Sequence, residues 1–169
     1  MRLLVVRHAI AEDREVFART GQTDDRRPLT GRGRERMALG ARGLATLVRS
    51  VDVLAASPYL RTMETAALLA EAWEGPTPVP VGALEPGGDY DQLGAWLRAL
   101  GPDQRVAIVG HEPHLSGFVS RLIGARGSVI EFKKGAACYL TLAPSAGAGS
   151  GVLHWAVNPK QLRRLAEAD

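Results

Sequence analysis

The sequence predicts an α/β fold: a three-layer sandwich with a mainly parallel central sheet, helices on both faces, and antiparallel edge strands near the C-terminus. Up to residue 113, short apolar runs alternate with amphipathic segments, which is the pattern of parallel strands joined by helical crossovers. From Ser128 onward, strand-like runs are separated by turns rich in Gly and Ser. A chain of 169 residues, 46% of them hydrophobic, suffices for one core, so we expect residues 1–169 to form a single domain.

The first strand is predicted at Leu3–Val6, a continuous apolar run typical of a strand covered on both faces. Its carboxyl end leads into Arg7 and His8. Similar buried runs follow at Val51–Ala56 and Val106–Val109. Between them, Val79–Val81 can form at most a short strand, because proline donates no hydrogen bond to a ladder. The C-terminal strands are expected at Ile130–Phe132, Ala136–Ala143 and Val152–Val157.

Three segments have the apolar spacing of helices. The first opens near Thr30, and its expected buried side chains are Met37, Ala41, Leu44 and Val48. The second follows Ser57-Pro58, where a hydroxyl cap would precede proline at the first helical position. Its expected buried side chains are Leu60, Met63, Ala67, Ala70 and Trp73. The third helix is expected at Asp91–Leu100.

Polar residues follow three of the predicted strands, where open α/β sheets bind ligands. They are Arg7-His8 after the first run, Ser57 with the nearby Arg61 after the second, and His111 after the run at Val106–Val109. Two guanidinium groups and two imidazoles around one point would form an anion-binding site, since guanidinium binds phosphoryl oxygens bidentately and imidazole can attack phosphorus. Each motif alone is also compatible with a surface loop or a helix entry, so their joint placement carries the prediction.

The other chemically distinctive side chains indicate structural roles. Cys138 is predicted to be a buried thiol, and His154 a strand residue with a satisfied imidazole. We expect His114 at a helix surface or pocket rim. Its spacing from His111 suits a metal, but no third His or Cys lies nearby, so no metal site is predicted.

Charge and hydropathy restrict the partners. The net charge of +3 fits an anionic ligand. No aromatic-rich platform for RNA is present, so nucleic acid is not an expected partner. The sequence has neither a signal-peptide core nor a run able to span a bilayer, which predicts a cytoplasmic protein with no membrane partner.

Four ordered motifs resemble those of the histidine phosphatase superfamily, in particular its SixA-type branch of phosphohistidine phosphatases. They are Leu4-Val5-Val6-Arg7-His8-Ala9, Asp25-Arg26-Arg27-Pro28-Leu29-Thr30, Ala56-Ser57-Pro58 with Arg61-Thr62 and Thr65-Ala66, and Val109-Gly110-His111-Glu112-Pro113. The segments Phe132-Lys133-Lys134-Gly135 and Asn158-Pro159-Lys160 are similar too. Ala9, in place of the superfamily's usual glycine, is typical of that branch. Glu112 departs from it, standing where asparagine is common.

This resemblance implies a reaction. His8 would attack phosphorus from a solvent-facing position to form a phosphohistidine intermediate, which water then hydrolyses. Arg7, Arg61 and His111 would bind the transferring phosphoryl group, and neither a metal nor a cofactor is needed. The implied activity is that of a phosphohistidine phosphatase, and the implied partner is a histidine-phosphorylated protein or a small phosphorylated substrate.

Several alternatives remain open at this point. The general acid that phosphate esters need would be Glu85, Asp89 or no residue at all. The closest alternative function is a phosphatase of small phosphate esters on the same fold, and a more distant one is a non-catalytic phosphate- or nucleic-acid-binding module. Arg26 and Arg27, in the loop before the first long helix, are predicted to capture an acidic phosphoprotein.

Overall fold

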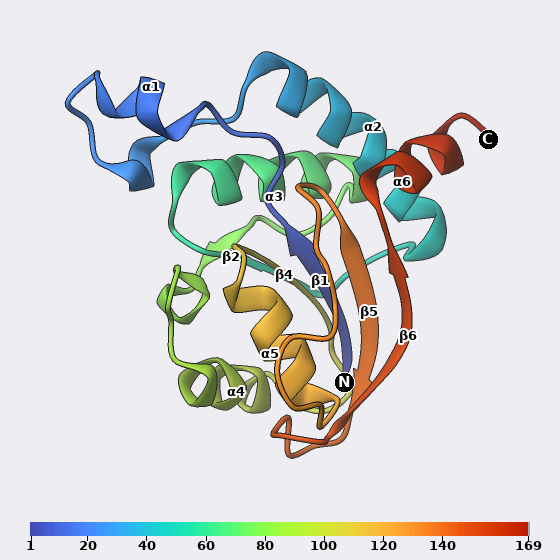
Figure 1. The fold of residues 1–169 in the computed structure, drawn as a ribbon. Helices are drawn as coiled ribbons and strands as arrows, with labels where there is room; N and C mark the ends of the chain where they lie inside the picture. The colour runs from blue at the N-terminus through green and yellow to red at the C-terminus, as the bar shows by residue number, and fades with distance from the viewer. Residues whose placement is uncertain (169) are drawn as a thin grey trace.

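A computed structural model describes residues 1–168 and contains one mixed sheet with the strand order β3-β2-β4-β1-β5-β6 (Figure 1). The strands are β1 (Arg2–Arg7), β2 (Val53–Ala56), β3 (Val79–Pro80), β4 (Arg105–Gly110), β5 (Ala137–Leu142) and β6 (Gly151–Val157). β1, β2, β3 and β4 run parallel, whereas β5 and β6 are antiparallel to their neighbours. The predicted mainly parallel sheet with antiparallel C-terminal strands is therefore confirmed.

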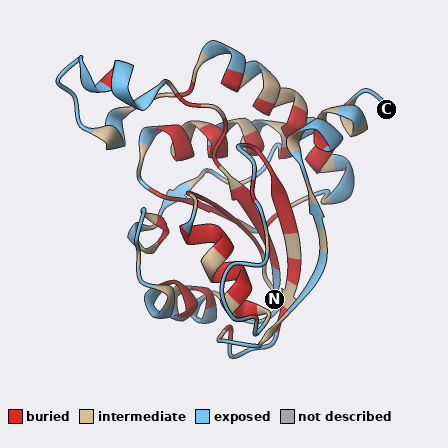
Figure 2. Cartoon of the chain, in the orientation of Figure 1, coloured by how far each residue is buried: buried red, intermediate tan, exposed pale blue. Residues whose placement is uncertain are grey.

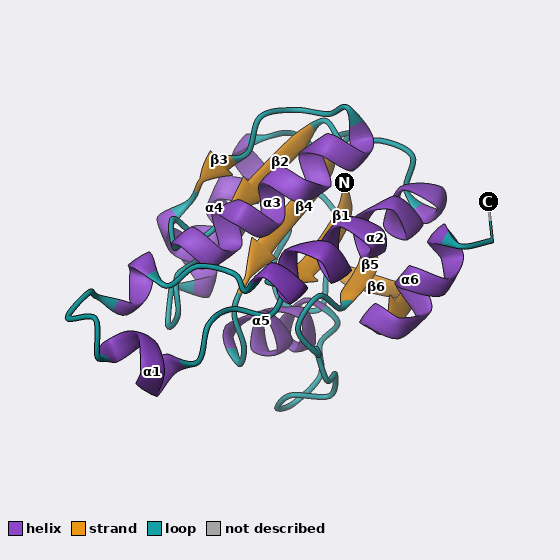
Figure 3. Ribbon diagram, turned by 90° about the horizontal axis from the view of Figure 1, so that it is seen from above, coloured by secondary structure: helices purple, strands orange, loops and turns teal. Residues whose placement is uncertain are grey.

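Helices cover both faces of this sheet (Figures 1 and 3). The α-helices are α1 (Arg14–Ala18), α2 (Gly31–Leu47), α3 (Leu60–Trp73), α4 (Tyr90–Ala99), α5 (His114–Leu122) and α6 (Pro159–Ala166), and the short 3-10 helices are η1 (Asp24–Arg26) and η2 (Gly82–Leu84). α2, α3 and α6 pack on one face, and α4 and α5 on the other. Both views show α1 projecting beyond the rest of the molecule.

β1 joins the two hydrophobic cores. Leu3 and Val5 pack into the core under α4 and α5, while Leu4 and Val6 pack into the core under α2 and α3. All four are buried, as the colouring of the central strands in Figure 2 shows. Successive strand residues point to opposite faces, so a strand buried on both faces needs an unbroken apolar run. This explains why the first strand could be recognised from the sequence.

The predicted strand at Ile130–Phe132 is wrong. These residues form a loop between α5 and β5. Phe132 is buried, but its carbonyl oxygen accepts a hydrogen bond from Arg7 Nη1 at 2.6 Å, not from a neighbouring strand. Gly135, with φ of +82°, then turns the chain into β5.

The predicted start of the second helix is wrong, and its predicted buried face is only partly right. α3 begins at Leu60 with Tyr59 as its N-cap, two residues beyond the expected position of Pro58. Its buried residues are Arg61, Thr62, Thr65, Ala66, Leu69 and Trp73. Leu60, expected inside, is 38% exposed. Trp73 is buried as expected, and Met63 and Ala70 pack against the core, whereas Ala67 is exposed. The buried face also carries polar side chains, which an apolar pattern alone does not reveal.

α6 was not expected from the apolar pattern. Asn158 and Gln161 form a capping box at its start, and Leu162 is fully buried against α2. Within residues 1–168, no helix combines the length and the apolar character needed to cross a membrane.

Candidate active site

Three side chains meet where the parallel strands β1, β2 and β4 end, namely His8, Ser57 and His111. In the sheet register, Arg7 lies opposite Gly110 and Ala56 lies opposite Val109, so the three strands end at one level. The chain segments stay linked just beyond the sheet, because the backbone N–H of His8 donates to the Gly110 carbonyl at 3.1 Å. The sequence prediction that these strand ends converge is therefore confirmed.

The His8 imidazole is held in one tautomer. Its Nδ1 lies 2.7 Å from the carbonyl oxygen of Ala9. Since a carbonyl only accepts hydrogen bonds, Nδ1 must carry the proton, and Nε2 keeps its lone pair. Only 6% of the residue is exposed, so the expectation of a solvent-facing imidazole is wrong. His8 is instead recessed among Arg7, Arg61 and His111, with its ring centroid 5.2 Å from that of His111.

The same surroundings keep His8 neutral. Burial is the main cause that lowers its pKa to about 3, the hydrogen bond to Ala9 opposes the shift, and the positive charges of Arg61, Arg7 and Lys134 add to it. A neutral imidazole with a free Nε2 is the nucleophilic form.

His111 is buried next to Ser57 and Tyr59. Its Nε2 lies 2.9 Å from Ser57 Oγ, and the Tyr59 ring contacts it edge-on with centroids 5.0 Å apart. Burial, followed by the charge of Arg61, lowers the pKa of His111 to about 3. The hydroxyl of Ser57 therefore orients a second neutral imidazole beside His8.

The side chain of Arg61 projects from the first turn of α3, and Asp24 in η1 holds its guanidinium group in place. Its Nη1 donates to the Asp24 carbonyl at 2.8 Å and its Nη2 to Asp24 Oδ2 at 3.1 Å, while the guanidinium lies 4.8 Å above the Tyr59 ring. Burial of the Asp24 carboxyl opposes ionisation, but the hydrogen bond from Arg27 and the charges of the arginines around it lower its pKa to about 2. Asp24 is therefore an ionised partner of Arg61.

Three nitrogen atoms at the site are buried and have no hydrogen-bond partner in the part of the chain that the structure describes. They are Arg7 Nε, Arg61 Nε and His111 Nδ1. An unsatisfied buried donor costs on the order of 1–3 kcal/mol. Such atoms mark where a bound oxyanion would gain hydrogen bonds, as transition-state stabilisation of a phosphoryl group requires.

Comparison with known proteins agrees with this geometry. Residues 3–84 match the histidine phosphatase superfamily (branch 1). The chain belongs to the histidine phosphatase superfamily. An uncharacterized protein of Picosynechococcus sp. (strain ATCC 27264 / PCC 7002 / PR-6) is 36% identical over 137 residues, which cover 79% of this chain and 81% of the relative.

Solved structures show the same superfamily fold. The tungstate complex of the protein histidine phosphatase SixA superposes with a TM-score of 0.82 at 25% identity, covering 96% of this chain and 99% of SixA. The α-ribazole phosphatase from Shigella flexneri has a TM-score of 0.69 at 19% identity, covering 91% and 95% of the two chains. The fold is therefore shared between a protein histidine phosphatase and an α-ribazole phosphatase.

Within residues 1–168, neither candidate general acid forms a hydrogen bond or ion pair with the side chains of Arg7, His8, Arg61 or His111. Asp89 is the N-cap of α4, and its Oδ1 accepts from the backbone of Asp91 at 2.7 Å. Glu85 is half-buried at the end of η2, with its carboxylate close to Gly82. Asp89 thus has a structural task, and Glu85 remains a candidate without a partner at His8.

Sequence reasoning missed Asp24 as a supporting residue. It places Ser57 directly after a strand, among the polar residues of the expected site, but assigns it only the role of a helix cap. Asp24 lies 37 residues before Arg61, and nothing in the sequence connects the two. Arg27 is held by Asp24 at 2.8 Å, so of the two arginines expected to capture substrate only Arg26 is exposed.

The remaining histidines and the cysteine have structural surroundings. His114 is buried, not on a helix surface: its Nε2 lies 2.9 Å from the Gly88 carbonyl, and it lines a hollow beside Pro113. His154 Nε2 pairs with the Thr141 hydroxyl at 2.9 Å, as expected. Cys138 is buried in β5, where burial raises its thiol pKa. Within residues 1–168, no three His, Cys, Asp or Glu side chains group as metal ligands would.

Proposed function

We propose that this protein is a phosphohistidine phosphatase in which His8 accepts the phosphoryl group. One observation carries the proposal: the Ala9 carbonyl fixes the proton on His8 Nδ1, which leaves Nε2 free to attack beside the buried, unpartnered nitrogen atoms of Arg7, Arg61 and His111. Positioning and charge stabilisation are what phosphoryl transfer demands of an enzyme.

The reaction has two displacements. In the first, the lone pair of His8 Nε2 forms a bond to phosphorus as the P–N bond of the substrate breaks, and the leaving imidazole takes up a proton from solvent water. In the second, water attacks the phosphoryl group on His8, releasing inorganic phosphate and restoring neutral His8. Arg7, Arg61 and His111 stabilise the charge on the phosphoryl oxygens in both steps.

The surroundings of the site favour a leaving group that needs little acid catalysis. Asp24 is held ionised by arginines, and Asp89 caps α4. Glu112 Oε1 accepts from the backbone of Ser116 at 2.9 Å. Imidazole is far less basic than an alkoxide, so it departs from phosphorus with less protonation. The likeness to SixA, a protein histidine phosphatase, points the same way.

A comparison of the turnover of a phosphohistidine peptide with the turnover of alkyl phosphates tests this proposal. We expect kcat/KM for phosphohistidine to exceed that for alkyl phosphates by about 10²-fold or more, because general acid catalysis typically contributes about 10² to 10⁴ to ester cleavage. A clear preference for alkyl phosphates would contradict it.

The second candidate function, a phosphatase of small esters, is favoured by the shared fold of α-ribazole phosphatase. Glu85→Gln distinguishes the two candidates. If the protein is a phosphohistidine phosphatase, this variant retains phosphohistidine turnover within about tenfold and loses residual alkyl ester hydrolysis by about 10² to 10⁴. If wild type prefers alkyl esters and depends on Glu85 for them, the small-ester function replaces our proposal.

A further inference from the structure

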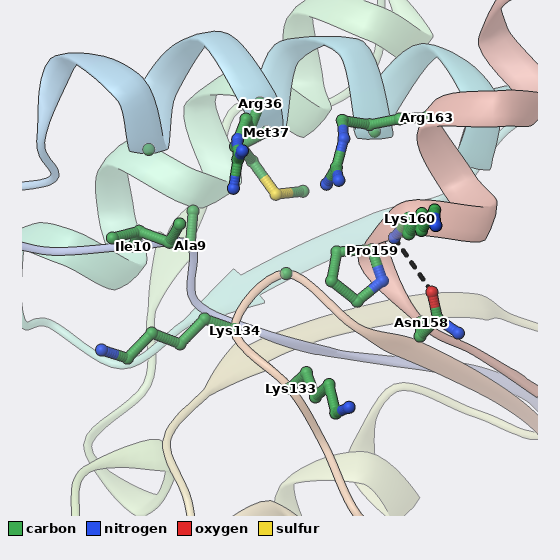
Figure 4. Close-up of a pocket in the computed structure, with 13 residues that line it drawn as sticks. Ala9, Ile10, Arg36, Met37, Lys133, Lys134, Asn158, Pro159, Lys160 and Arg163 are labelled. Carbon is green, nitrogen blue, oxygen red and sulfur yellow. Dashed lines mark hydrogen bonds between the residues drawn. The ribbon is translucent and has the colours of Figure 1, made fainter.

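A pocket of about 270 Å³ lies between α2, α6 and the loop that precedes β5 (Figure 4). Met37 and Gly40 of α2 line one side, and Pro159 of α6 lines another. Ala9 and Ile10, the two residues that follow His8, form part of the wall. None of the reaction steps above uses this pocket.

The pocket is lined by an excess of positive charge. Its lining contains five cationic side chains and, among the described residues, no Asp or Glu; the five are Arg36, Lys133, Lys134, Lys160 and Arg163. None of these five side chains forms a hydrogen bond or ion pair within residues 1–168, whereas Arg34, two residues before Arg36 on α2, pairs with Glu64 at 2.7 Å. Figure 4 shows Arg36 and Arg163 projecting from two helices into the same space.

Such an arrangement costs free energy unless an anion compensates it. Like charges repel, and a concave surface concentrates their field and attracts anions. Arg36 and Arg163 are half-buried, so their charges are less screened by solvent than those of the exposed lysines. Guanidinium groups bind phosphate or carboxylate in a bidentate manner. The chemistry of the pocket therefore suits an oxyanion.

The pocket is physically joined to the nucleophile. The backbone N–H of Gly135 donates to the carbonyl oxygens of both Arg7 and His8, at 3.1 Å each. This fixes the loop that carries Lys133 and Lys134 against the end of β1. The charge of Lys134 is also one of those that lower the pKa of His8. The pocket wall and His8 therefore belong to one hydrogen-bonded stretch of backbone.

We propose that the basic pocket binds a second anionic group of the substrate, a carboxylate cluster or a phosphate, while the phosphoryl group to be transferred lies at His8. The pocket is smaller than the roughly 300–1,000 Å³ typical of sites that hold a whole small molecule, so it accommodates one such group and its connecting atoms. This inference rests on the proposed function, because it assumes that His8 receives the other anionic group.

Binding of inorganic phosphate tests the pocket without any turnover. In equilibrium dialysis, wild type should bind two equivalents, and the double variant Arg36→Gln/Arg163→Gln only one. The matched control Arg32→Gln/Arg164→Gln removes two exposed arginines from the same two helices, outside the pocket lining, and should still bind two. One equivalent on wild type, or equal loss in the control, would overturn the proposal.

Paired substrates then identify the source of the second anion. One pair is a phosphohistidine peptide flanked by Glu against the same peptide flanked by Gln, and the other is an alkane bisphosphate against its monophosphate. Wild type should prefer the doubly anionic member in one of the two pairs. In that pair, the Arg36→Gln/Arg163→Gln variant should reduce the preference in kcat/KM tenfold or more by raising KM for the doubly anionic member. The Arg32→Gln/Arg164→Gln control should keep the wild-type preference. A loss in the peptide pair assigns protein carboxylates, and a loss in the alkane pair assigns a second phosphate.

The outcomes separate the two proposals. No preference in either pair on wild type, or a preference that the pocket variant retains, would contradict the pocket's role in substrate binding. If wild type binds two phosphates in the dialysis but turns over neither kind of substrate, the proposed function fails while the anion site stands.

Discussion

At the scale of single residues, the site depends on keeping two imidazoles neutral inside a positively charged environment. His8 and His111 are each buried near Arg61, and both pKa values are lowered to about 3. For His8 the hydrogen bond from Nδ1 to Ala9 also decides which nitrogen can attack. Burial thus supplies the reactive protonation state at neutral pH, and it makes the fold sensitive to acid.

We therefore expect the free energy of unfolding to fall as pH decreases below about 6.5. The unfolded chain binds protons on both histidines near their ordinary pKa of about 6.5, and the folded chain does so only near 3, so the unfolded state binds more protons in this window. A full difference of one bound proton changes the free energy of unfolding by about 1.4 kcal/mol per pH unit. Averaged from pH 7 to pH 4.5, each histidine therefore contributes roughly 1 kcal/mol per pH unit, because its unfolded form is only partly protonated near pH 6.5.

Urea unfolding between pH 7 and pH 4.5 measures this slope. His8→Asn and His111→Asn should each reduce the slope of the unfolding free energy against pH by roughly the 1 kcal/mol per pH unit that one buried histidine contributes. His154→Asn serves as the control, because its exposed imidazole on β6 is not one of the buried pair. If all three variants keep the wild-type slope, the buried histidines do not control the acid sensitivity.

At the scale of elements, buried strands could be predicted and elements held by tertiary contacts could not. Leu3–Val6 is apolar without interruption because both faces of β1 are covered. α6 shows no comparable apolar pattern, since Leu162 is its only fully buried side chain. The inner face of α3 carries Arg61 and Thr65 as well as Trp73, so apolar periodicity identified only part of it.

The docking of α6 on α2 depends on Gly43. A Cβ added there would lie 1.9 Å from the Leu162 carbonyl oxygen, so Gly43→Ala must push the helices apart. Overpacking of this kind costs roughly 1–3 kcal/mol. At Gly40, on the same helix, the nearest atom would be Leu162 Cβ at 3.8 Å, an ordinary contact. Gly40→Ala should instead gain up to about 1 kcal/mol from helix propensity.

Chemical denaturation of the two variants checks this contrast directly. Gly43→Ala should lower the denaturation midpoint, and Gly40→Ala should leave it unchanged or raise it. Because α6 forms one side of the basic pocket, Gly43→Ala should also weaken the binding of the second equivalent of inorganic phosphate. Equal stability of the two variants would mean that α2 and α6 do not pack as closely as the structure shows.

At the scale of the whole molecule, the sheet topology explains which parts of the site the sequence could reveal. Parallel strands end on one edge, so Arg7, His8 and His111 could be grouped without coordinates. Asp24, in η1, and Lys134, in the loop before β5, reach the site by paths that depend on packing. Lys134 stands in a segment that resembles the family, but the sequence indicates no contact of either residue with the site. A single domain and a cytoplasmic location remain predictions.

The central claim is that His8 carries the phosphoryl group during turnover. The most direct measurement is to mix the enzyme with a phosphohistidine peptide labelled in its phosphoryl group, quench it within one turnover, and map the label by mass spectrometry. Wild type should carry an acid-labile, alkali-stable label on His8, the His8→Asn protein should carry none, and a His154→Asn control should retain it. A label on another residue, or an equal label on the His8→Asn protein, would contradict the account.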